Sequence, residues 1–357
     1  MKVMVDGREF VRGRATGIGR FLSDGLCELA VMKRDWQFVL ILNQHSEFVP
    51  DFPNLKKLRF TEVFTTFADQ VQIPWFIRGE KADVFLSPYY KTPLLSGVPA
   101  VVTICDLINL IYPGYARSSA FYRQLFGIYA AKASAILTIS DNSKVDIMRL
   151  LGVPEEKLSV IYPGVDPGVF YRKRQTAVFR SKYGLDVPYL LYMGNGNPHK
   201  NVNGLIAAYN LLSPEFKGRY RLVLCGVGDS EIALEQFSSG SCVRIGYVPD
   251  ADMAELYSGA ELLVFPSFYE GFGLPPLEAM ACGCPVVSSR ASCMPEVLAD
   301  ACLYFDPDNI LDIRDKMQHV LSDASLRAEL IRKGYDRAAG YKPERTAAEI
   351  VRVIERV

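Results

Sequence analysis

Two glutamates, Glu270 and Glu278, stand with seven residues between them, on either side of a loop that contains Gly271 and Gly273. The loop follows the apolar run Leu262–Phe265, which is typical of a strand. A strand, a glycine-containing loop and a helix in this order present backbone N–H groups and the positive end of the helix dipole to an anion. Glu278 could then accept hydrogen bonds from sugar hydroxyls beside a bound phosphate, and Glu270 stands on the other side of the loop.

The helix after this loop is delimited by residues with known positional preferences. Pro275 or Pro276 suits the first helical turn, and Gly283 suits the end of the helix. Glu278 is then expected in the first turn. Acidic residues favour that position in any helix, and glycine and proline are ordinary at such a turn, so the spacing alone does not establish a site.

Two further glycine segments could contribute to the same chemistry. Lys200 lies in Gly194–Asn201, between a predicted strand and a predicted helix, and Gly17 and Gly19 open a predicted helix after a strand at Lys2–Asp6. A lone lysine is usually a solvated surface residue, and a lone glycine turn is usually structural. Beside a phosphate, however, a lysine would neutralise part of the negative charge.

The elements that would position these residues are short apolar runs that alternate with helical patterns. The runs are apolar throughout, which is typical of parallel strands covered on both faces. Alternating strands and helices predict an α/β fold. Besides the two strands named above, the predicted strands are Phe38–Leu42, Val84–Ser87, Val101–Cys105, Ala135–Ile139, Val160–Tyr162, Tyr189–Met193, Tyr220–Cys225, Val243–Tyr247 and Val286–Ser288.

Length and composition bound the architecture and the partners. For 357 residues we expect two domains, with the boundary in the segment Tyr162–Gly168, which is rich in proline and glycine. The 40 basic and 40 acidic side chains cancel, which argues against a nucleic-acid binder held by bulk charge. No apolar run is long enough to span a bilayer and the first residues do not resemble a signal peptide, so we expect a cytoplasmic protein. The eight cysteines show no zinc-binding spacing, so no metal is expected.

The segment Phe265–Val287 as a whole resembles the signature of the retaining GT-B glycosyltransferases, in particular glycosyltransferase family 4. The resemblance implies two Rossmann-like, doubly wound parallel-sheet domains that face a central cleft. Glu278 would bind the ribose of a nucleotide-sugar donor, and Glu270 would lie at the hydroxyls of the donor sugar. The backbone amides that would hold the donor diphosphate are those of Gly271, Phe272, Gly273 and Leu274.

Other segments extend this resemblance over most of the chain. Gly17, Gly19 and Arg20 correspond to a loop that faces the donor phosphates from the N-terminal domain. Lys200 corresponds to the cation that neutralises the diphosphate, and Val248 lies where relatives hold the nucleotide base. The terminal segment is predicted to form one helix, which in this fold crosses back to the first domain. The expected parts are therefore an acceptor-side domain, a nucleotide-sugar domain and the returning helix, at 1–168, 169–340 and 341–357.

The chain departs from the family pattern at two places. Many relatives have an arginine where this chain has Asn195 or His199, which would weaken one phosphate contact unless His199 partly replaces it. Cys105 stands before Asp106, where relatives usually have a histidine that contacts the donor sugar. A thiol supplies neither an imidazole donor nor a positive charge. Cys105 therefore indicates a donor sugar held differently, an altered activity or an inactive protein.

The resemblance implies transfer of a hexose from a nucleoside-diphosphate sugar to a hydroxyl group, with retention of the anomeric configuration. The expected catalytic residues are Glu270, Lys200 and Asp106, and no cofactor or metal ion is expected, because Lys200 and the glycine loops would stabilise the departing diphosphate. We take mannose from GDP-mannose as the donor, and a saccharide or lipid-linked saccharide of surface polysaccharide synthesis as the acceptor. The stretch Tyr115–Lys132 mixes basic and aromatic side chains and could lie against a membrane, although a helix that packs internally is the favoured interpretation.

Three other functions are left open by the sequence. A dinucleotide-dependent oxidoreductase would need Gly-X-Gly-X-X-Gly, and the segments that begin at Gly17, Gly194 and Gly226 lack the third glycine. A non-catalytic protein that binds sugar nucleotides is compatible with Cys105. A phosphorylase of the same fold would need a lysine that anchors pyridoxal phosphate, and no such site is evident in the sequence.

Overall fold

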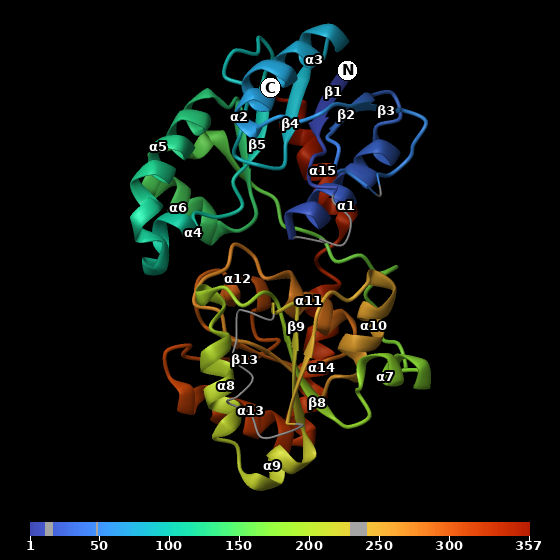
Figure 1. Ribbon diagram of the computed structural model, residues 1–357, viewed down its shortest axis with the longest axis vertical. Coiled ribbons are helices and arrows are strands. Elements are labelled where there is room, and N and C mark those ends of the chain that lie inside the picture. The colour runs from blue at the N-terminus through green and yellow to red at the C-terminus, as the bar shows by residue number, and fades with distance from the viewer. Residues whose placement is uncertain (11–16, 48, 229–240) are drawn as a thin grey trace. The chain divides into compact units, whose positions relative to one another are not determined.

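The structure, a computed structural model, describes residues 1–357 except 11–16, 48 and 229–240. The chain forms two compact units, which we call the N-domain and the C-domain (Figure 1). The N-domain comprises Met1–Gly164 together with Lys342–Val357, and the C-domain comprises Val165–Tyr341. Each unit is therefore described by itself below.

The chain passes between the two units at points that differ slightly from those predicted. The chain leaves the N-domain after Gly164 and returns to it after Tyr341, whereas the sequence predicts these two boundaries after Gly168 and Gly340. The Val165 N–H donates a hydrogen bond of 2.9 Å to the Tyr341 carbonyl oxygen. This bond joins the first and last residues of the C-domain. The first domain boundary therefore lies within the proline- and glycine-rich segment Tyr162–Gly168, and not at its end.

Each domain is built on one sheet of parallel strands. The N-domain sheet has the order β3-β2-β1-β4-β5-β6-β7, and the C-domain sheet has the order β10-β9-β8-β11-β12-β13. The order reverses beside β1 and beside β8, so both sheets are doubly wound and Rossmann-like, which confirms the predicted fold class. The strands are β1 Lys2–Asp6, β2 Gln37–Leu42, β3 Leu55–Arg59, β4 Val84–Ser87, β5 Ala100–Thr103, β6 Ala135–Thr138, β7 Leu158–Val160, β8 Tyr189–Met193, β9 Arg221–Cys225, β10 Cys242–Ile245, β11 Leu262–Phe265, β12 Val286–Ser289 and β13 Leu303–Phe305.

Helices connect the strands and cover both sheets (Figure 1). The α-helices are α1 Gly17–Met32, α2 Thr65–Phe67, α3 Ile73–Glu80, α4 Ile108–Ile111, α5 Ala116–Lys132, α6 Asp141–Leu151, α7 Ala177–Tyr183, α8 Val202–Asn210, α9 Pro214–Arg219, α10 Asp250–Gly259, α11 Leu274–Ala281, α12 Met294–Leu298, α13 Ile310–Ser322, α14 Ala324–Ala338 and α15 Pro343–Ile354. The short π- and 3₁₀-helical turns are η1 Ala68–Gln72, η2 Pro113–Tyr115, η3 Glu155–Lys157 and η4 Pro198–Lys200.

Successive residues of β1 point to opposite faces of the N-domain sheet, and both faces are buried. Val3 and Val5 belong to the hydrophobic cluster that contains α1 and α15, whereas Met4 packs on the other face with Ile73 and Ile77 of α3. The three β1 side chains are fully buried. A strand covered on both faces must be apolar at successive positions, which is why its sequence does not alternate.

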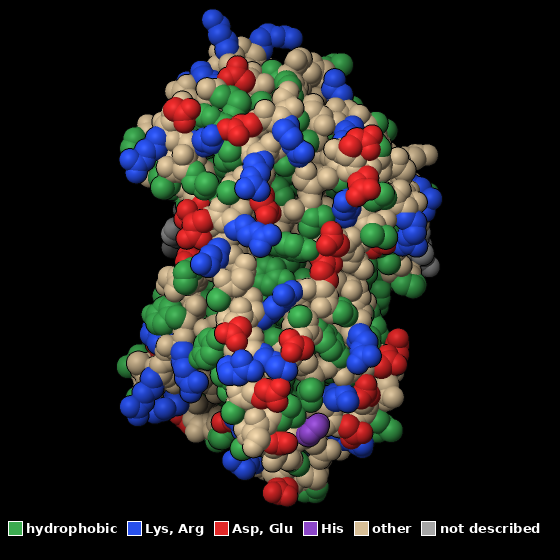
Figure 2. Space-filling view, turned by 180° about the vertical axis from the view of Figure 1, so that it is seen from behind, with side chains coloured by type: hydrophobic (Ala, Val, Ile, Leu, Met, Phe, Trp, Pro, Cys, Tyr) green, Lys and Arg blue, Asp and Glu red, His purple; other side chains and the backbone are tan. Residues whose placement is uncertain are grey.

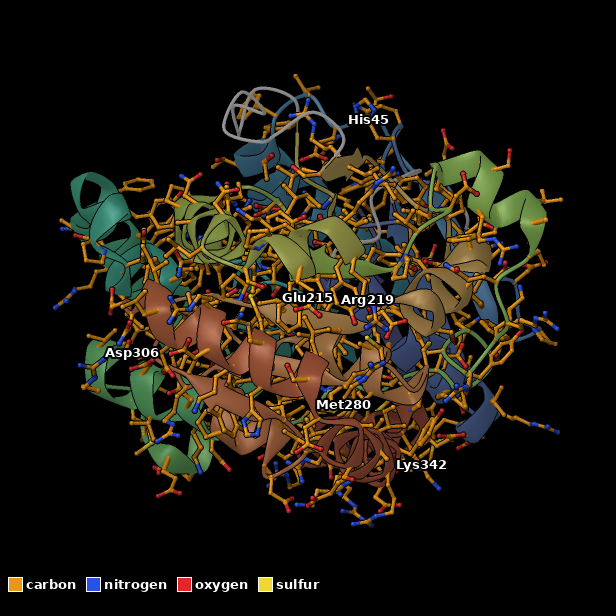
Figure 3. The ribbon with its side chains drawn as sticks, turned by 90° about the horizontal axis from the view of Figure 1, so that it is seen from below. His45, Glu215, Arg219, Met280, Asp306 and Lys342 are labelled. Atoms are coloured by element: carbon orange, nitrogen blue, oxygen red, sulfur yellow. The ribbon has the colours of Figure 1, made fainter. Side chains whose placement is uncertain are left out.

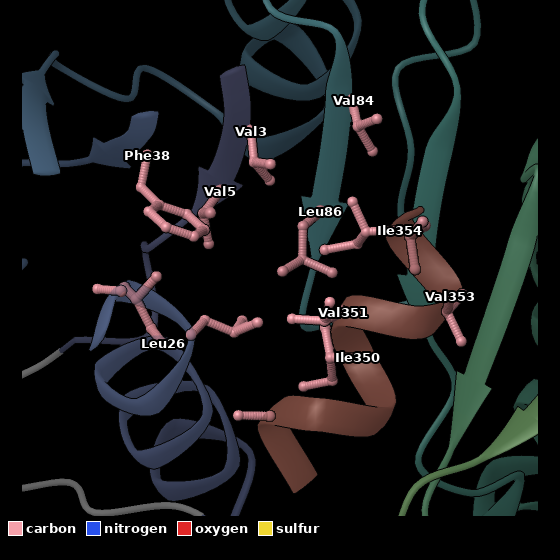
Figure 4. Packing of buried hydrophobic residues seen from close by; sticks show 14 of the residues in the cluster. Val3, Val5, Leu26, Phe38, Val84, Leu86, Ile350, Val351, Val353 and Ile354 are labelled. Atoms are coloured by element: carbon pink, nitrogen blue, oxygen red, sulfur yellow. The ribbon is translucent and has the colours of Figure 1, made fainter. Parts of the chain in front are cut away.

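The last helix, α15, completes the hydrophobic core of the N-domain. Ile350, Val351 and Ile354 share one cluster with Leu26 of α1 and Leu86 of β4 (Figure 4). The terminal segment thus belongs to the N-domain although it follows the C-domain in the sequence.

Helices of the C-domain pack closely on strand β8 and on helix α14. Leu190 and Tyr192 of β8 are fully buried in a cluster that includes residues of α8 and α13. Helix α11 lies against α14 at Gly334, where a Cβ atom would come within 3.0 Å of the Cγ atom of Met280, a buried residue labelled in Figure 3. This contact fixes the helix that follows the Gly271 and Gly273 loop.

The sequence patterns miss two strands and displace a third. Strand β3 contains Lys56, Lys57 and Arg59 and lies at the edge of the N-domain sheet, where charged side chains are tolerated and discourage pairing with other chains. Strand β13 is three residues long and lies at the edge of the C-domain sheet. Strand β7 begins at Leu158, two residues before the predicted start at Val160. All three strands lie at a sheet edge, where a strand pairs with another strand on one side only. Their side chains are only partly buried, so their sequences carry a weaker apolar pattern.

The surface carries charges of both signs. Lys and Arg side chains lie among Asp and Glu side chains over the face drawn in Figure 2, as the net charge of zero suggests. Among the described residues, no helix is long and apolar enough to cross a membrane.

Ile350→Ala is expected to lower the free energy of unfolding of the N-domain by about 2–5 kcal/mol, because the cavity it leaves lies in the core beside α1. Chemical denaturation followed by circular dichroism measures this change. Leu311→Ala, at a helical position that is 51% exposed, is the control and should cost less than about 0.5 kcal/mol. Equal losses in the two variants would contradict the packing of α15 in this core.

Candidate functional site

The C-domain loops that follow neighbouring strands lie together at the carboxyl edge of the sheet. The Gly194 N–H donates to the Cys225 carbonyl oxygen (3.0 Å), and the Gly226 N–H donates to the Ile245 carbonyl oxygen (2.9 Å). The loops after β8, β9 and β10 are therefore side by side. Gly226 has a φ of 83°, and a Cβ atom there would lie 3.0 Å from the Gly194 carbonyl oxygen, so this approach requires glycine. In open parallel sheets, ligands bind at this edge.

The best-defined contact at this edge is an ion pair between Lys200 and Glu270. Lys200 Nζ lies 2.7 Å from Glu270 Oε1 and 2.8 Å from Glu270 Oε2. Lys200 follows β8 and Glu270 follows β11, and these two strands pair directly although 70 residues separate the side chains. The Phe268 N–H also donates to the His199 carbonyl oxygen at 2.8 Å. The point where the strand order reverses thus brings the two segments together.

Three residues that no sequence motif singles out hold Glu270 in place. The Ser267 hydroxyl donates to Glu270 Oε1 (2.6 Å), and the Glu270 N–H donates to the Ser292 hydroxyl oxygen (3.0 Å). The Cys293 thiol donates to the Glu270 carbonyl oxygen (3.2 Å), and burial raises the pKa of this thiol, so that it stays protonated. Ser292 and Cys293 follow β12, the strand next to β11, so their role depends on the sheet order.

Gly273 fixes the start of α11. Its φ is 87°, a backbone conformation that residues with a side chain rarely adopt, so the position favours glycine. The helix begins at Leu274, which places Pro275 and Pro276 in its first turn, as predicted. These prolines remove two N–H groups that the helix N-terminus would otherwise offer. An anion at this position would therefore depend more on the loop amides than on the helix itself.

Glu278 does not lie in the first turn of α11, which is a correction to the sequence-based expectation. The helix begins before both prolines, so Glu278 falls in the second turn. Its side chain is 4% exposed, and Oε2 accepts a hydrogen bond of 2.6 Å from the hydroxyl of Tyr257 in α10. Glu278 is thus a buried carboxylate with a fixed orientation, and not an exposed acid at a helix start.

His199 cannot replace the positive charge of the arginine found in relatives. Burial and the neighbouring charge of Lys200 lower the pKa of His199 to about 4. The imidazole is therefore neutral at physiological pH and contributes only hydrogen bonds. Lys200 is the cation that this segment supplies.

Val248, expected beside the nucleotide base, belongs to the same row of loops. It is buried and lies just after β10, next to Tyr247, which is 55% exposed. The preceding Gly246 carbonyl oxygen accepts a long hydrogen bond of 3.6 Å from the Cys225 thiol. The segment after β10 is thus tied to the end of β9.

The N-domain holds the remaining predicted site residues. Helix α1 begins at Gly17 and contains Gly19, whereas the side chain of Arg20 lies outside the described part of the structure. Asp106 follows β5, and its Oδ1 accepts a hydrogen bond of 3.0 Å from the Ile108 N–H at the start of α4. The carboxyl end of β5 therefore carries Asp106.

Cys105 precedes Asp106 and is half-buried. Burial, followed by the charges of Asp106 and Glu9, raises the pKa of the Cys105 thiol. The thiol is therefore protonated at physiological pH, which makes it a poor nucleophile and leaves it without the charge of a histidine.

The predicted site residues are thus divided between the two domains. The loops after neighbouring strands of the C-domain carry Lys200, Val248, Glu270, Gly271, Phe272, Gly273 and Leu274, with Glu278 in the helix that follows. The N-domain carries Gly17, Gly19, Cys105 and Asp106.

Two family models match the chain, and together they cover most of both domains. The model described as Glycosyltransferase Family 4 matches residues 32–169. The model described as Glycosyl transferases group 1 matches residues 174–337.

Individual proteins extend this likeness. O-antigen chain mannosyltransferase B of Escherichia coli is 33% identical over 78% of this chain and 75% of its own length. The serotype-specific mannosyltransferase WbdA of Escherichia coli is 31% identical over 64% of this chain, but the match spans only 30% of that longer protein. Among solved structures, the sucrose-phosphate synthase of Thermosynechococcus elongatus has a TM-score of 0.78 at 18% identity and covers 100% of this chain and 98% of its own. Anabaena HepE in complex with UDP-glucose has a TM-score of 0.77 at 17% identity and covers 100% of both chains. The two family models and the O-antigen chain mannosyltransferase show that the chain belongs to glycosyltransferase family 4, with the GT-B fold.

Proposed function

We propose that this glycosyltransferase transfers mannose from GDP-mannose to a saccharide or lipid-linked saccharide in the synthesis of a surface polysaccharide. The names of the O-antigen chain mannosyltransferase and of WbdA support mannose and this kind of product. The UDP-glucose complex of HepE supports a nucleoside-diphosphate sugar as the donor. The reaction would retain the anomeric configuration and need no metal ion, and the protein would work in the cytoplasm in peripheral contact with the membrane.

The single observation that carries this proposal is the ion pair between Lys200 and Glu270. The two side chains are 18% and 10% exposed, so without a donor each compensates a largely buried charge of the other. A lysine ammonium has three N–H groups, and the two carboxylate oxygens engage no more than two of them. Lys200 could therefore bind a diphosphate oxygen while it still positions Glu270 beside the sugar.

The proposed mechanism relies on charge stabilisation. Negative charge grows on the diphosphate as its bond to the sugar breaks, so groups fixed around the diphosphate lower the barrier. Lys200 and the amides of the 271–274 loop would supply this stabilisation in the C-domain. Glu270 would position the donor sugar, because both of its carboxylate oxygens are already hydrogen-bonded. Asp106 is the catalytic residue that we propose in the N-domain.

Glu278 would bind the ribose of the nucleotide. Its carboxylate is oriented by Tyr257 before any donor binds, which reduces the entropy lost on binding. Val248 and the backbone around it would hold the base at the end of β10.

A second candidate function is binding of sugar nucleotides without catalysis. The protonated thiol of Cys105 stands where relatives usually have a histidine at the donor sugar, and this observation favours an altered site. Both candidate functions predict that the protein binds the donor. Only the first predicts that the protein transfers the sugar to an acceptor.

Purified protein is expected to release GDP from GDP-mannose in the presence of mannose-containing oligosaccharide acceptors, at a rate that a chelator does not change, because Lys200 supplies the cationic charge. Chromatography of the free nucleotide measures the rate, and NMR of the product gives its anomeric configuration. Strict dependence on added metal would refute the proposed mechanism, and absence of nucleotide binding would refute the site. Binding without turnover on any acceptor would favour the second candidate.

Lys200→Met is expected to lower kcat by about 10²–10³-fold, because it removes a fixed charge at the leaving group. The same variant should bind GDP more weakly, which isothermal titration calorimetry measures. Lys333→Met is the matched control, since Lys333 pairs with Asp300 and Glu329 at the surface of the same domain, and it should stay within about twofold of the wild type. If the two variants behave alike while both remain folded, Lys200 is not the diphosphate cation.

A further inference from the structure

One helical segment of the N-domain exposes apolar side chains on its outer side. The segment runs from Phe64 through α2, η1 and α3, and its inner side buries Ala68, Ile73 and Ile77. A surface helix normally turns polar residues outward. Along this segment, four outward residues are apolar and lie three or four positions apart, namely Phe64 (59% exposed), Phe67 (38%), Val71 (50%) and Trp75 (69%).

Two neighbouring residues enlarge this surface. Val63 is 71% exposed, and Leu95 is 80% exposed. The segment that carries Leu95 is tied beside η1, because the Leu94 N–H donates to the side-chain oxygen of Gln70 at 2.9 Å. We call the resulting surface the apolar face, and its members are Val63, Phe64, Phe67, Val71, Trp75 and Leu95. A contiguous exposed apolar surface is typical of an interaction site, unlike single exposed apolar residues.

The charges around the apolar face are unbalanced in favour of cations. Arg78 and Lys81 are exposed at the end of the segment and form no ion pair within the described residues. Every acidic residue between 60 and 99, by contrast, is bound by a cation or an N–H group. These contacts are Glu62 with Arg8 (3.2 Å), Asp69 with Arg8 (2.5 Å), Glu80 with Lys56 (2.6 Å) and Asp83 with the Lys2 N–H (2.6 Å).

We propose that the apolar face docks the N-domain on a lipid bilayer with anionic headgroups. Tryptophan and phenylalanine suit the boundary between headgroups and acyl chains, and a helix with an apolar stripe lies flat in that boundary. Arg78 and Lys81 would then contact lipid phosphates. The inference deepens the proposed function, because it gives the membrane contact a defined surface, but lipid binding itself requires neither donor nor acceptor.

The apolar face differs from the stretch Tyr115–Lys132, which on sequence alone could lie against a membrane. Most of that stretch is helix α5, which buries Phe126 and Tyr129 in the N-domain core. Its large exposed apolar residues, Phe121 and Ile128, are seven positions apart, with the exposed Arg123 between them. Helix α5 therefore packs internally, as the favoured interpretation predicts, but its described exposed residues are both apolar and polar, namely Ala120, Phe121, Arg123, Gln124, Ile128, Ala131 and Lys132.

Tryptophan fluorescence tests the docking directly, because the chain has two tryptophans in different surroundings. Trp36 is 5% exposed, whereas Trp75 is 69% exposed and belongs to the apolar face. In Trp36→Phe protein, vesicles of phosphatidylglycerol and phosphatidylcholine are expected to shift the emission of Trp75 to shorter wavelength. Vesicles of phosphatidylcholine alone should bind several-fold more weakly, since the charge of Arg78 and Lys81 adds to the attraction. No spectral shift with anionic vesicles would overturn the proposal.

A pair of valine variants separates docking from general effects of charge. Val71→Asp should weaken vesicle binding about tenfold in a sedimentation assay, because it places a charge in the exposed apolar stripe that docking would bury in the bilayer. Val145→Asp makes the same change on α6, at a position that is 60% exposed and outside the apolar face, and should bind vesicles as the wild type does. Equal binding by the two variants would overturn the proposal.

Light scattering without lipid tests a second copy of the chain as the alternative occupant. The proposal expects the same molar mass for the wild type and for Val71→Asp. A wild-type dimer that Val71→Asp dissociates would assign the apolar face to self-association instead. If GDP-mannose is not a substrate while the vesicle results hold, the proposed function fails and the docking surface stands.

Discussion

The parallel pairing of β8 with β11 is the constraint on which the candidate site depends. Its register sets Leu190 opposite Leu262 and Leu191 opposite Leu263, and all four side chains are fully buried. Because the side chains of a strand alternate between the faces, a slip of one residue would exchange the side chains packed on the two faces of the sheet, so close packing on both faces holds the register. The segments after both strands must then leave the sheet at the same edge, and Lys200 meets Glu270 there without any local sequence relation between them.

Charge in this protein is organised locally, although the whole chain has no net charge. The C-domain places one cation and one carboxylate at the strand ends, and the N-domain holds Arg8 after β1 between the carboxylates of Asp6, Glu62 and Asp69. Asp69 lies on the inner side of η1, so its bond to Arg8 also fixes how this helical segment faces outward. The same buried network thus positions the apolar face.

The sequence predicts the strands that are buried on both faces and fails where burial is partial. Strands β4, β8 and β11 have the predicted bounds, because each apolar run is followed directly by a proline or a glycine, whereas the charged edge strand β3 carries no such signal. In the site, the motifs identify Lys200 and the two glutamates. The partners Tyr257 and Cys293 come from other segments, and only the three-dimensional packing brings them to Glu278 and to the Glu270 backbone. Burial likewise decides that His199 is neutral, which the residue type alone does not determine.

The central claim is that the ion pair at the ends of β8 and β11 marks the donor diphosphate site. A crystal structure of the full chain with bound GDP-mannose tests it most directly. We expect Lys200 Nζ within about 3 Å of a diphosphate oxygen, with the ribose hydroxyls at Glu278 and the pairing of β8 with β11 unchanged. A nucleotide bound away from this edge of the C-domain sheet, with Lys200 still paired only to Glu270, would show that the ion pair does not mark the diphosphate site.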